Sequence, residues 1–210
     1  MRLVVTSDTH FKFPVDFVPD GDVFIHCGDL MYTGYINEWQ DRLDSLAALP
    51  HKTKLFIPGN HDLHIEVYPG PALQELRKVG VTVIGVPGND RYTSYKLDNG
   101  MSVLGLPWVT GLPRWAWNRD EEWIDEYLAH MWRHKIVCSH APPAGILDGK
   151  SYGIKAYRRY LKMYQPEYWF FGHVHEDYGQ AAVDGCLLYN VAAQNESYTG
   201  LVNKPVVVDI

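Results

Sequence analysis

Residues 59–62 read Gly-Asn-His-Asp, and they directly follow the apolar run Lys54-Leu55-Phe56-Ile57-Pro58. An apolar run of this length that ends in glycine and asparagine predicts a buried strand that stops abruptly and turns. The polar residues of such a turn project from the end of a sheet, which is where the active sites of α/β proteins lie. We therefore expect the functional centre of the protein at this turn.

Four other apolar runs end in the same way, in small residues and in side chains that can bind a metal. They lead into Asp8-Thr9-His10, Gly28-Asp29, His140 and Gly172-His173-Val174-His175. Residues two apart in an extended segment point to the same side, so Asp8 and His10 can face one site, as can His173 and His175. With the central turn, these motifs offer seven metal ligands, namely Asp8, His10, Asp29, Asn60, His140, His173 and His175.

The candidate ligands supply carboxylate, amide and imidazole groups. This mixture suits Mn, Fe, Zn, Co or Ni better than Mg or Ca alone, and the set is large enough for two ions if one carboxylate is shared. Taken singly, each residue is more often structural, since an asparagine after glycine is usually a turn residue and a lone histidine is usually hydrogen-bonded. The ordered set of motifs at successive strand ends is hard to explain by chance, and it favours a metal site.

The composition bounds the class of protein. A chain of 210 residues, 46% hydrophobic and 21% charged, is typical of one globular domain, which we expect to span residues 1–210. It has no run that resembles a signal peptide or a membrane span, and its cysteines lie far apart in apolar runs, so we expect a reduced, cytoplasmic protein that does not associate with membranes. The net charge of −6 argues against a protein that grips nucleic acid through its phosphates, but it is compatible with a metal-centred site for a phosphate ester.

The apolar pattern also predicts the order of helices and strands. Helical spacing of apolar residues between Ile36 and Leu49, stopped by Pro50, predicts a crossover helix that joins two parallel strands. A turn at Asp98-Asn99-Gly100 predicts an antiparallel hairpin. We expect strands at 2–6, 22–27, 54–57, 81–84, 92–97, 101–106, 135–139, 168–171, 186–191 and 205–209, and further helices at 71–79, 120–133 and 154–164. Strands and helices alternate first and hairpins enter later, which favours a mixed α/β sandwich.

These motifs, in this order, resemble the complete motif set of the calcineurin-like metallophosphoesterases. The resemblance runs essentially end to end and is strongest to the MPPED-type branch, which is related to the class III cyclic nucleotide phosphodiesterases. The branch assignment rests on residues 21–29, 115–118, 140–148 and 172–176. The resemblance implies an α/β fold, a four-layer α/β/β/α sandwich of two mixed β-sheets flanked by helices. It also implies an enzyme that hydrolyses phosphoric esters with two divalent transition-metal ions, of which Mn is favoured for activity.

The resemblance further implies a role for each matching residue. Asp8, His10 and His175 would hold one ion, Asn60, His140 and His173 would hold the other, and Asp29 would bridge both. A water or hydroxide between the ions would attack the phosphorus in line. His61 would protonate or stabilise the leaving oxygen, and Asp62 would orient its imidazole. The alternative is that His61 only steadies Asn60.

The sequence leans toward a small phosphodiester substrate, with a cyclic nucleotide as the leading candidate. Phosphoprotein phosphatases of this superfamily carry an arginine after the second motif for a phosphate dianion, whereas this chain continues Gly28-Asp29-Leu30-Met31-Tyr32. Candidates for stacking on a base are Tyr92, Trp108, Trp115 and Trp117, although core packing explains large aromatic residues equally well. The alternatives are a DNA or RNA nuclease, which needs a basic groove, a phosphomonoesterase, and a non-catalytic binding scaffold of the same fold.

Overall fold

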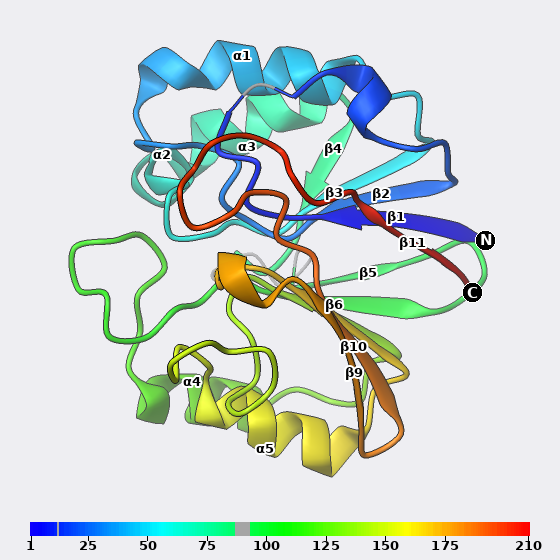
Figure 1. Cartoon of the computed structure of the whole chain (residues 1–210), viewed down its shortest axis with the longest axis vertical. Helices are drawn as coiled ribbons and strands as arrows, with labels where there is room; N and C mark the ends of the chain where they lie inside the picture. Colours follow the sequence, from blue (N-terminus) through cyan, green and yellow to red (C-terminus); the bar gives the residue numbers. More distant parts are fainter. Residues whose placement is uncertain (12, 87–92) are drawn as a thin grey trace.

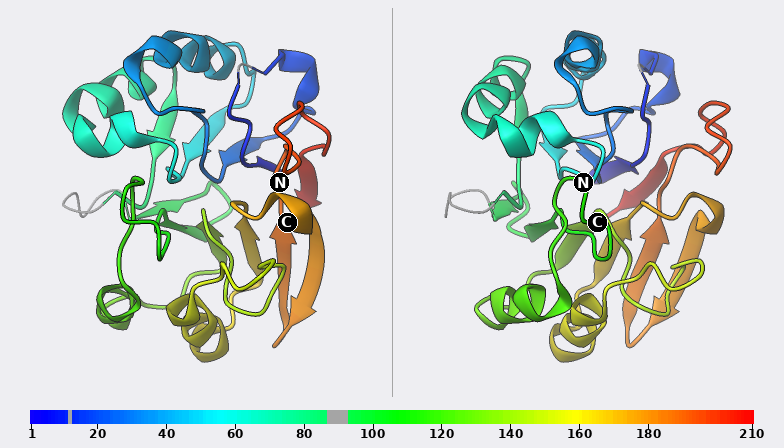
Figure 2. Two further views of the ribbon diagram at one scale, coloured as in Figure 1. Left: turned by 60° about the vertical axis from the view of Figure 1, so that its left-hand side comes forward. Right: turned by 90° about the vertical axis from the view of Figure 1, so that its left-hand side faces the viewer.

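The structure is a computed structural model that describes residues 1–11, 13–86 and 93–210. Two β-sheets lie one above the other, and helices cover the outer face of each sheet (Figure 1, Figure 2). The predicted four-layer α/β/β/α sandwich of two mixed sheets is therefore confirmed.

The first sheet contains five strands in the order β11-β1-β2-β3-β4. Strands β1 to β4 are parallel to one another, and β11 pairs antiparallel with β1. The strands are β1 (Arg2–Thr6), β2 (Val23–His26), β3 (Thr53–Phe56), β4 (Val81–Val83) and β11 (Val206–Asp209). The helices that cover the outer face of this sheet are α1 (Ile36–Ala47), α2 (Leu63–Val67) and α3 (Pro69–Lys78) (Figure 1).

The second sheet contains six strands in the order β5-β6-β7-β8-β10-β9. Its four middle strands are parallel, and the edge strands β5 and β9 are antiparallel to their neighbours. The strands are β5 (Ser94–Lys96), β6 (Ser102–Leu106), β7 (Ile136–Ser139), β8 (Tyr168–Phe171), β9 (Gly179–Val183) and β10 (Cys186–Asn190). The helices that cover its outer face are α4 (Glu121–Ala129) and α5 (Lys155–Tyr164) (Figure 1).

The strands are apolar throughout because both of their faces are buried. In β1, Leu3 and Val5 belong to the cluster between the sheets, whereas Val4 belongs to the cluster under the helices. Parallel strands covered on both sides read as continuous apolar runs for this reason. In α1 the buried residues Trp39, Leu43 and Leu46 follow helical spacing, and they pack this helix on the sheet.

One α-helix and one strand among the described residues were not predicted from the sequence, nor were the short 3-10 helices at Val15–Phe17 and His175–Asp177. Helix α2 is only five residues long and follows Asp62 directly, so it offers too short a pattern to detect. Strand β9 forms a hairpin with β10 through Asp184 and Gly185, whose φ angles are 51° and 82°. An Asp-Gly pair is a strong hairpin signal, but β9 reads Gly-Gln-Ala-Ala-Val, with one β-branched residue and no aromatic residue to mark it as a strand.

The parallel strands place the motif loops at one edge of the sandwich. The carboxyl ends of β1, β2 and β3 point to the same side as those of β7 and β8, away from the two termini (Figure 1). No helix among the described residues is both long enough and apolar enough to cross a membrane.

Candidate metal centre

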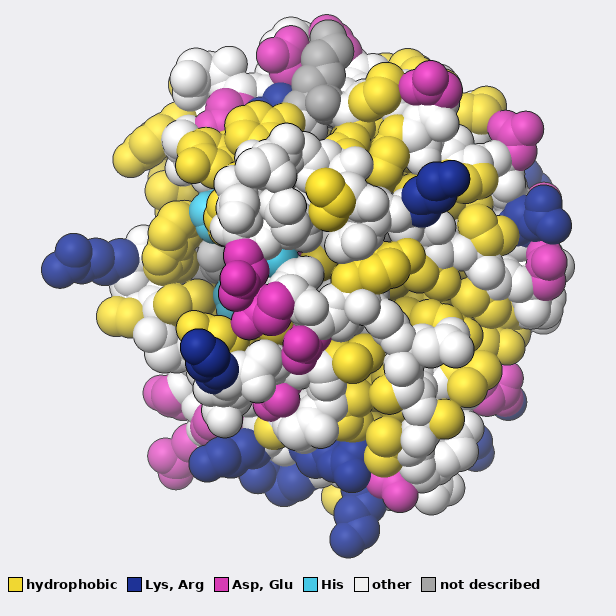
Figure 3. All heavy atoms as spheres, viewed as in Figure 1, with side chains coloured by type: hydrophobic (Ala, Val, Ile, Leu, Met, Phe, Trp, Pro, Cys, Tyr) yellow, Lys and Arg dark blue, Asp and Glu magenta, His cyan; other side chains and the backbone are white. Residues whose placement is uncertain are grey.

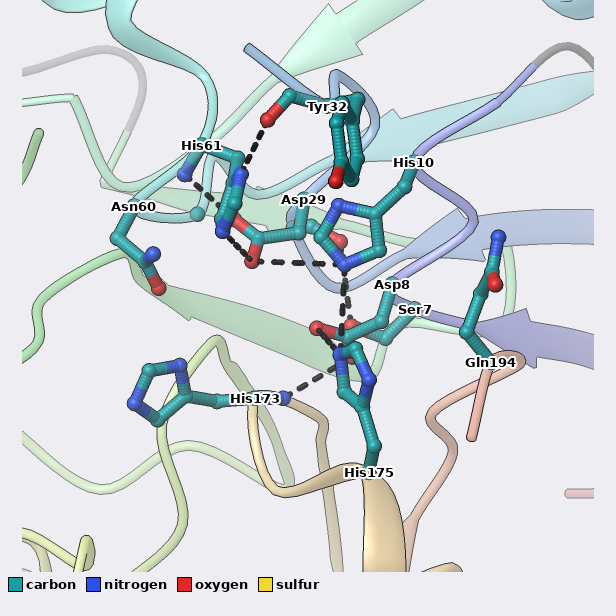
Figure 4. Close-up of polar contacts among 12 residues, drawn as sticks. Ser7, Asp8, His10, Asp29, Tyr32, Asn60, His61, His173, His175 and Gln194 are labelled. Atoms are coloured by element: carbon teal, nitrogen blue, oxygen red, sulfur yellow. Dashed lines mark hydrogen bonds and ion pairs between the residues drawn. The ribbon is translucent and has the colours of Figure 1, made fainter. Parts of the chain in front are cut away.

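All seven predicted ligands converge where the motif loops of the two sheets meet. Ligand atoms of Asp8, His10 and His175 lie within 4.8 Å of one another, and the same is true of Asp29, His140 and His173. Asn60 joins the second group, since its Oδ1 is 2.9 Å from His140 Nε2. Figure 4 shows Asp29 between the first group and His61. The structure therefore brings the sequence-predicted set together as two adjoining groups.

The backbone is strained at several of these positions. The φ angles of Asp8, His10, Asp29 and His173 are 52°, 54°, 55° and 69°. Left-handed conformations in residues other than glycine raise the energy of the fold, and they cluster at functional sites. Gly172 allows a related close approach, because a Cβ at this position would collide with Asp8 Oδ2. The chain is thus bent at the points where it delivers its ligands.

Backbone carbonyls fix the histidine rings in one orientation. The Nδ1 atoms of His10, His140 and His175 lie 3.0, 2.9 and 3.1 Å from the carbonyl oxygens of Met31, Cys27 and Asn195. A carbonyl can only accept, so each Nδ1 carries a proton, and Nε2 is the nitrogen that faces the site and can bind a metal once it is deprotonated. This is the arrangement that metal-binding histidines adopt in proteins.

Histidine Nε2 atoms and carboxylate oxygens face one another at the centre of the site, and one of these oxygens accepts no hydrogen bond from the described residues. His10 Nε2 lies 3.3 Å from His175 Nε2, which in turn lies 3.4 Å from Asp8 Oδ1. Asp8 is completely buried, and its Oδ1 accepts no hydrogen bond from the described residues. His140 Nε2 lies 3.3 Å from Asp29 Oδ2 in the second group. Lone pairs and carboxylates packed this closely fit divalent cations, and the oxygen and imidazole donors suit transition metals.

The pKa shifts in the metal-free site reflect the negative charge of the two buried carboxylates, Asp8 and Asp29. Burial alone would raise the pKa of Asp8, but the contact with His175 Nε2 and the charge of His175 hold it well below its usual value. Burial would likewise lower the pKa of His140 and His175, yet the charges of Asp29 and Asp8 raise both to about 9. Burial dominates at His10 and His173 and lowers their pKa to about 4. Protons on two histidines thus balance the carboxylates that a metal ion would otherwise neutralise.

Asp62 binds backbone amides and does not contact the imidazole of His61 among the contacts that the structure describes. Its carboxylate accepts hydrogen bonds from the backbone amides of Asp29, Leu30, Met31 and Gly59 at 2.9, 3.1, 3.0 and 2.7 Å. The prediction that Asp62 orients the imidazole of His61 is therefore wrong, because both of its oxygens already bind the loop that carries Asp29. Burial and the charge of Asp29 raise the pKa of Asp62 to about 7, against the effect of these amides.

The carbonyl of Tyr32 orients His61 instead. His61 Nδ1 lies 2.5 Å from Tyr32 O, and its Nε2 lies 4.0 Å from Asp29 Oδ2. The ring packs against Trp115, with 4.2 Å between the ring centroids. His61 also forms a third group of candidate ligands with His10 and Asp29. The Nε2 atom of His61 therefore faces Asp29 and the other candidate ligands, and Trp115 lies against the same imidazole ring.

The predicted aromatic contacts are only partly placed at the site. Trp108 and Trp117 are 0% and 2% exposed, and Trp108 packs against Trp123 and Tyr127, so these two tryptophans belong to the core. The prediction that Trp108 and Trp117 contact the substrate is wrong for this reason. Trp115 is 42% exposed beside His61, and Tyr92 lies outside the described residues.

Sequence reasoning missed two tyrosines that border the histidines. Tyr198 has ring centroids 4.9 Å from those of both His10 and His175, and Tyr152 lies 6.2 Å from His173. Both come from loops without apolar periodicity, so no local pattern announces them. They become candidates only once the fold places those loops over the metal centre.

A partly buried ion pair on α1 connects two of the ligand loops. Glu38 accepts hydrogen bonds from the backbone amides of Tyr32 and Thr33 at 2.6 and 2.7 Å. Arg42 donates to Glu38 at 3.4 Å and to the carbonyl oxygen of His10 at 3.0 Å. The pair thus fixes the loop that orients His61 relative to the loop that carries His10.

Comparison with known proteins shows what this chain is similar to. Residues 1–177 match the family described as calcineurin-like phosphoesterase. The human metallophosphoesterase domain-containing protein 1 is 29% identical over 100% of this chain and 71% of its own length. A UPF0046 protein of Caenorhabditis elegans is 28% identical over 100% of this chain and 81% of its own length. A crystal structure with 12% identity superposes with a TM-score of 0.69 over 99% of this chain and 98% of that chain, a likeness of fold alone.

Proposed function

The chain belongs to the calcineurin-like phosphoesterase family, and from this premise we propose that it is a dinuclear metal-dependent phosphodiesterase for small diesters. Membership implies a metal-dependent phosphoester hydrolase, and the His and Asp groups of the site are consistent with metal binding. The number of ions and the preference for diesters are the proposal. The observation that carries it is the pair of adjoining ligand groups, with every anchored histidine turning Nε2 inward.

Each ligand group would hold one ion. Asp8, His10 and His175 would bind the first ion, Asn60, His140 and His173 the second, and Asp29, which has ligand atoms near both groups, would contribute to both. When bound, the ions would lower the pKa of an attacking water and offset negative charge on the phosphate. The protein holds the ligands in place before any ion arrives, through the carbonyls of Met31, Cys27 and Asn195.

His61 would move a proton at the leaving oxygen. Its Nδ1 is held by the carbonyl of Tyr32, so Nε2 is the atom that faces the reaction. Asp29 Oδ2, 4.0 Å away, would stabilise the protonated ring until the proton passes to the leaving group. Trp115 closes the other side of the ring and keeps it from turning outward.

The charges around the centre favour a diester over a monoester. A phosphomonoester dianion is best recognised by a bidentate arginine. Arg42 lies next to a ligand loop, and its guanidinium donates to Glu38 and to the carbonyl oxygen of His10. The pocket that adjoins His173 and His175 has no lysine or arginine among its described lining residues. A diester carries one negative charge less and needs no such cation.

A nuclease is the second candidate, since cleavage of a nucleic acid uses the same chemistry on a larger diester. It would need a basic groove along the backbone, and the net charge of −6 opposes this. A cyclic nucleotide remains the leading small diester, because Trp115 offers an exposed ring next to His61.

A comparison of rates in Mn²⁺ tests the proposal. The substrates are 2′,3′- and 3′,5′-cyclic nucleotides, a chromogenic diester, a phosphomonoester, and single- and double-stranded DNA, each with and without chelator. We expect the highest kcat/KM on a small diester and none after chelation. A higher kcat/KM on DNA that falls steeply with salt would establish the nuclease. Absence of turnover together with absence of bound metal would instead indicate a binding scaffold.

A further inference from the structure

A pocket of about 300 Å³ opens directly over the metal centre. Two candidate ligands, His173 and His175, form part of its lining, and Tyr152, Tyr198, Glu176 and Glu196 form most of the rest. This volume is at the lower end of the range for small-molecule sites. The pocket is therefore the place where a group attached to a phosphate at the metals would lie.

The pocket is acidic, and its described lining residues include no lysine or arginine. Glu176 and Glu196 line it, and within residues 1–11, 13–86 and 93–210 neither side chain makes a hydrogen bond or an ion pair. The neighbouring Asp177 is different, because its carboxylate accepts the amide of Gly149 at 2.7 Å. Figure 3 shows acidic side chains gathered beside the histidines on this face. Two free carboxylates in one pocket would repel a second phosphate and attract a cation.

The tyrosines give the pocket aromatic walls. Tyr152 is 54% exposed and lies against His173, while Tyr198 is half-buried against His175. Aromatic rings attract an ammonium group through their electron-rich faces, and combinations of aromatic rings with carboxylates recognise quaternary ammonium ligands. A neutral base would gain nothing from Glu176 and Glu196, so the carboxylates distinguish the two kinds of ligand.

The pocket lies apart from the leaving-group side. His61, the group assigned to the leaving oxygen, packs against Trp115 and Tyr32 and is not among the residues that line this pocket. The ester group in the pocket is therefore the one that stays on phosphorus after cleavage.

We propose that this pocket binds an ammonium group, and that among acyclic phosphodiesters the preferred substrates are zwitterionic ones whose retained ester carries that cation. The phosphate would lie at the metals and the ammonium between Glu176, Glu196 and the two tyrosines. The expected preference in turnover rests on the proposed phosphodiesterase function. The expected preference in binding does not, because the pocket can bind an ammonium group whether or not the ester is cleaved.

Binding is tested with two probes of nearly equal shape. Phosphocholine carries a quaternary ammonium, and 3,3-dimethylbutyl phosphate replaces that nitrogen with carbon. Calorimetry on the Mn²⁺-loaded protein should give a Kd about ten-fold lower for phosphocholine, as expected for a cation held by aromatic rings and exposed carboxylates. The double variant Glu176→Gln, Glu196→Gln should bring the ratio close to one. The double variant Glu122→Gln, Glu126→Gln, on α4 at the outer face of the second sheet, removes the same number of charges elsewhere and should leave the ratio unchanged.

Turnover is compared on the p-nitrophenyl diesters of the same two alcohols. We expect kcat/KM to favour the choline ester by a similar factor, and the double variant to lose this preference. Equal binding of the two phosphates by the unaltered protein, or a preference that survives in the double variant, would overturn the inference. If neither diester is cleaved while phosphocholine still binds more tightly, the proposed phosphodiesterase function fails and the ammonium pocket stands.

Discussion

Replacing Glu38 with alanine should weaken both the fold and the reaction, although this residue binds no metal. Its carboxylate accepts the amides of Tyr32 and Thr33, and it is the ion-pair partner of Arg42. The carbonyl of Tyr32 in turn holds Nδ1 of His61. Glu38→Ala therefore frees the loop that orients the proposed general acid, and it leaves Arg42 with the carbonyl of His10 alone.

The size of the effect follows from these contacts. Hydrogen bonds to a charged group contribute about 1.5–3 kcal/mol each. Tyr32 is 42% exposed, so water can reach the freed amides and reduce the loss. We expect the free energy of unfolding to fall by about 2–3 kcal/mol. We also expect kcat to fall by about 10- to 100-fold, the usual effect of removing a group that supports a metal site.

Denaturant unfolding of the metal-free protein measures the first effect, and single-substrate kinetics at saturating Mn²⁺ measures the second. Gln40→Ala is the matched control, because Gln40 lies on the exposed side of the same helix and its side chain donates a hydrogen bond to Asp44. It should change stability by less than about 0.5 kcal/mol. Glu38→Gln keeps one acceptor oxygen and should give an intermediate result. The reasoning is refuted if Glu38→Ala unfolds at the same denaturant concentration as Gln40→Ala and retains full kcat.

Other positions give further expectations. His61→Ala should keep its bound metal and lose about 10²- to 10⁴-fold in kcat; loss of metal with normal kcat after metal is restored would show that His61 is a ligand or a support of Asn60. Trp108→Ala should lower the free energy of unfolding by about 3–5 kcal/mol because this ring is fully buried, whereas Trp115→Ala should mainly lower kcat/KM on aromatic diesters. Without metal, His140 and His175 have a folded pKa of about 9 against an ordinary value of 6.5, so the stability that they contribute is complete below about pH 6.5 and is lost as the pH rises through about 9. Unfolding in chelator at several pH values should show a decline over that interval, and a rise would contradict the assigned shifts.

The sequence predicted the architecture, and it predicted which candidate ligands the fold brings together, because both depend on short-range signals. Each ligand follows a strand buried on both faces, so an apolar run marks the strand and the next polar residue marks the site. Parallel strands then bring residues as far apart in the chain as Asp8 and His173 to one edge. This inference requires no knowledge of loop conformation.

The parts that were missed depend on loop conformation. Asp62 was predicted to orient the imidazole of His61. Its carboxylate instead accepts from the amides of Asp29, Leu30 and Met31, which lie 33, 32 and 31 positions earlier in the chain. The contact between Glu38 and the loop at Tyr32 lies within six residues, yet Glu38 alone reads as an ordinary exposed position of a helix. The sequence could not show that Trp115 is exposed and Trp117 is buried, because the burial of each ring depends on how the loop packs.

The number of ions that each chain holds tests the central claim most directly. Protein incubated with Mn²⁺ and freed of excess metal should contain two ions per chain by elemental analysis. Its electron paramagnetic resonance spectrum should show that the two ions are magnetically coupled, as expected for neighbours that share a carboxylate. Asp29→Ala should lose both ions and retain the circular dichroism of the folded chain, because Asp29 contributes ligand atoms to both groups. A single ion in the unaltered protein, or two coupled ions in Asp29→Ala, would contradict the account.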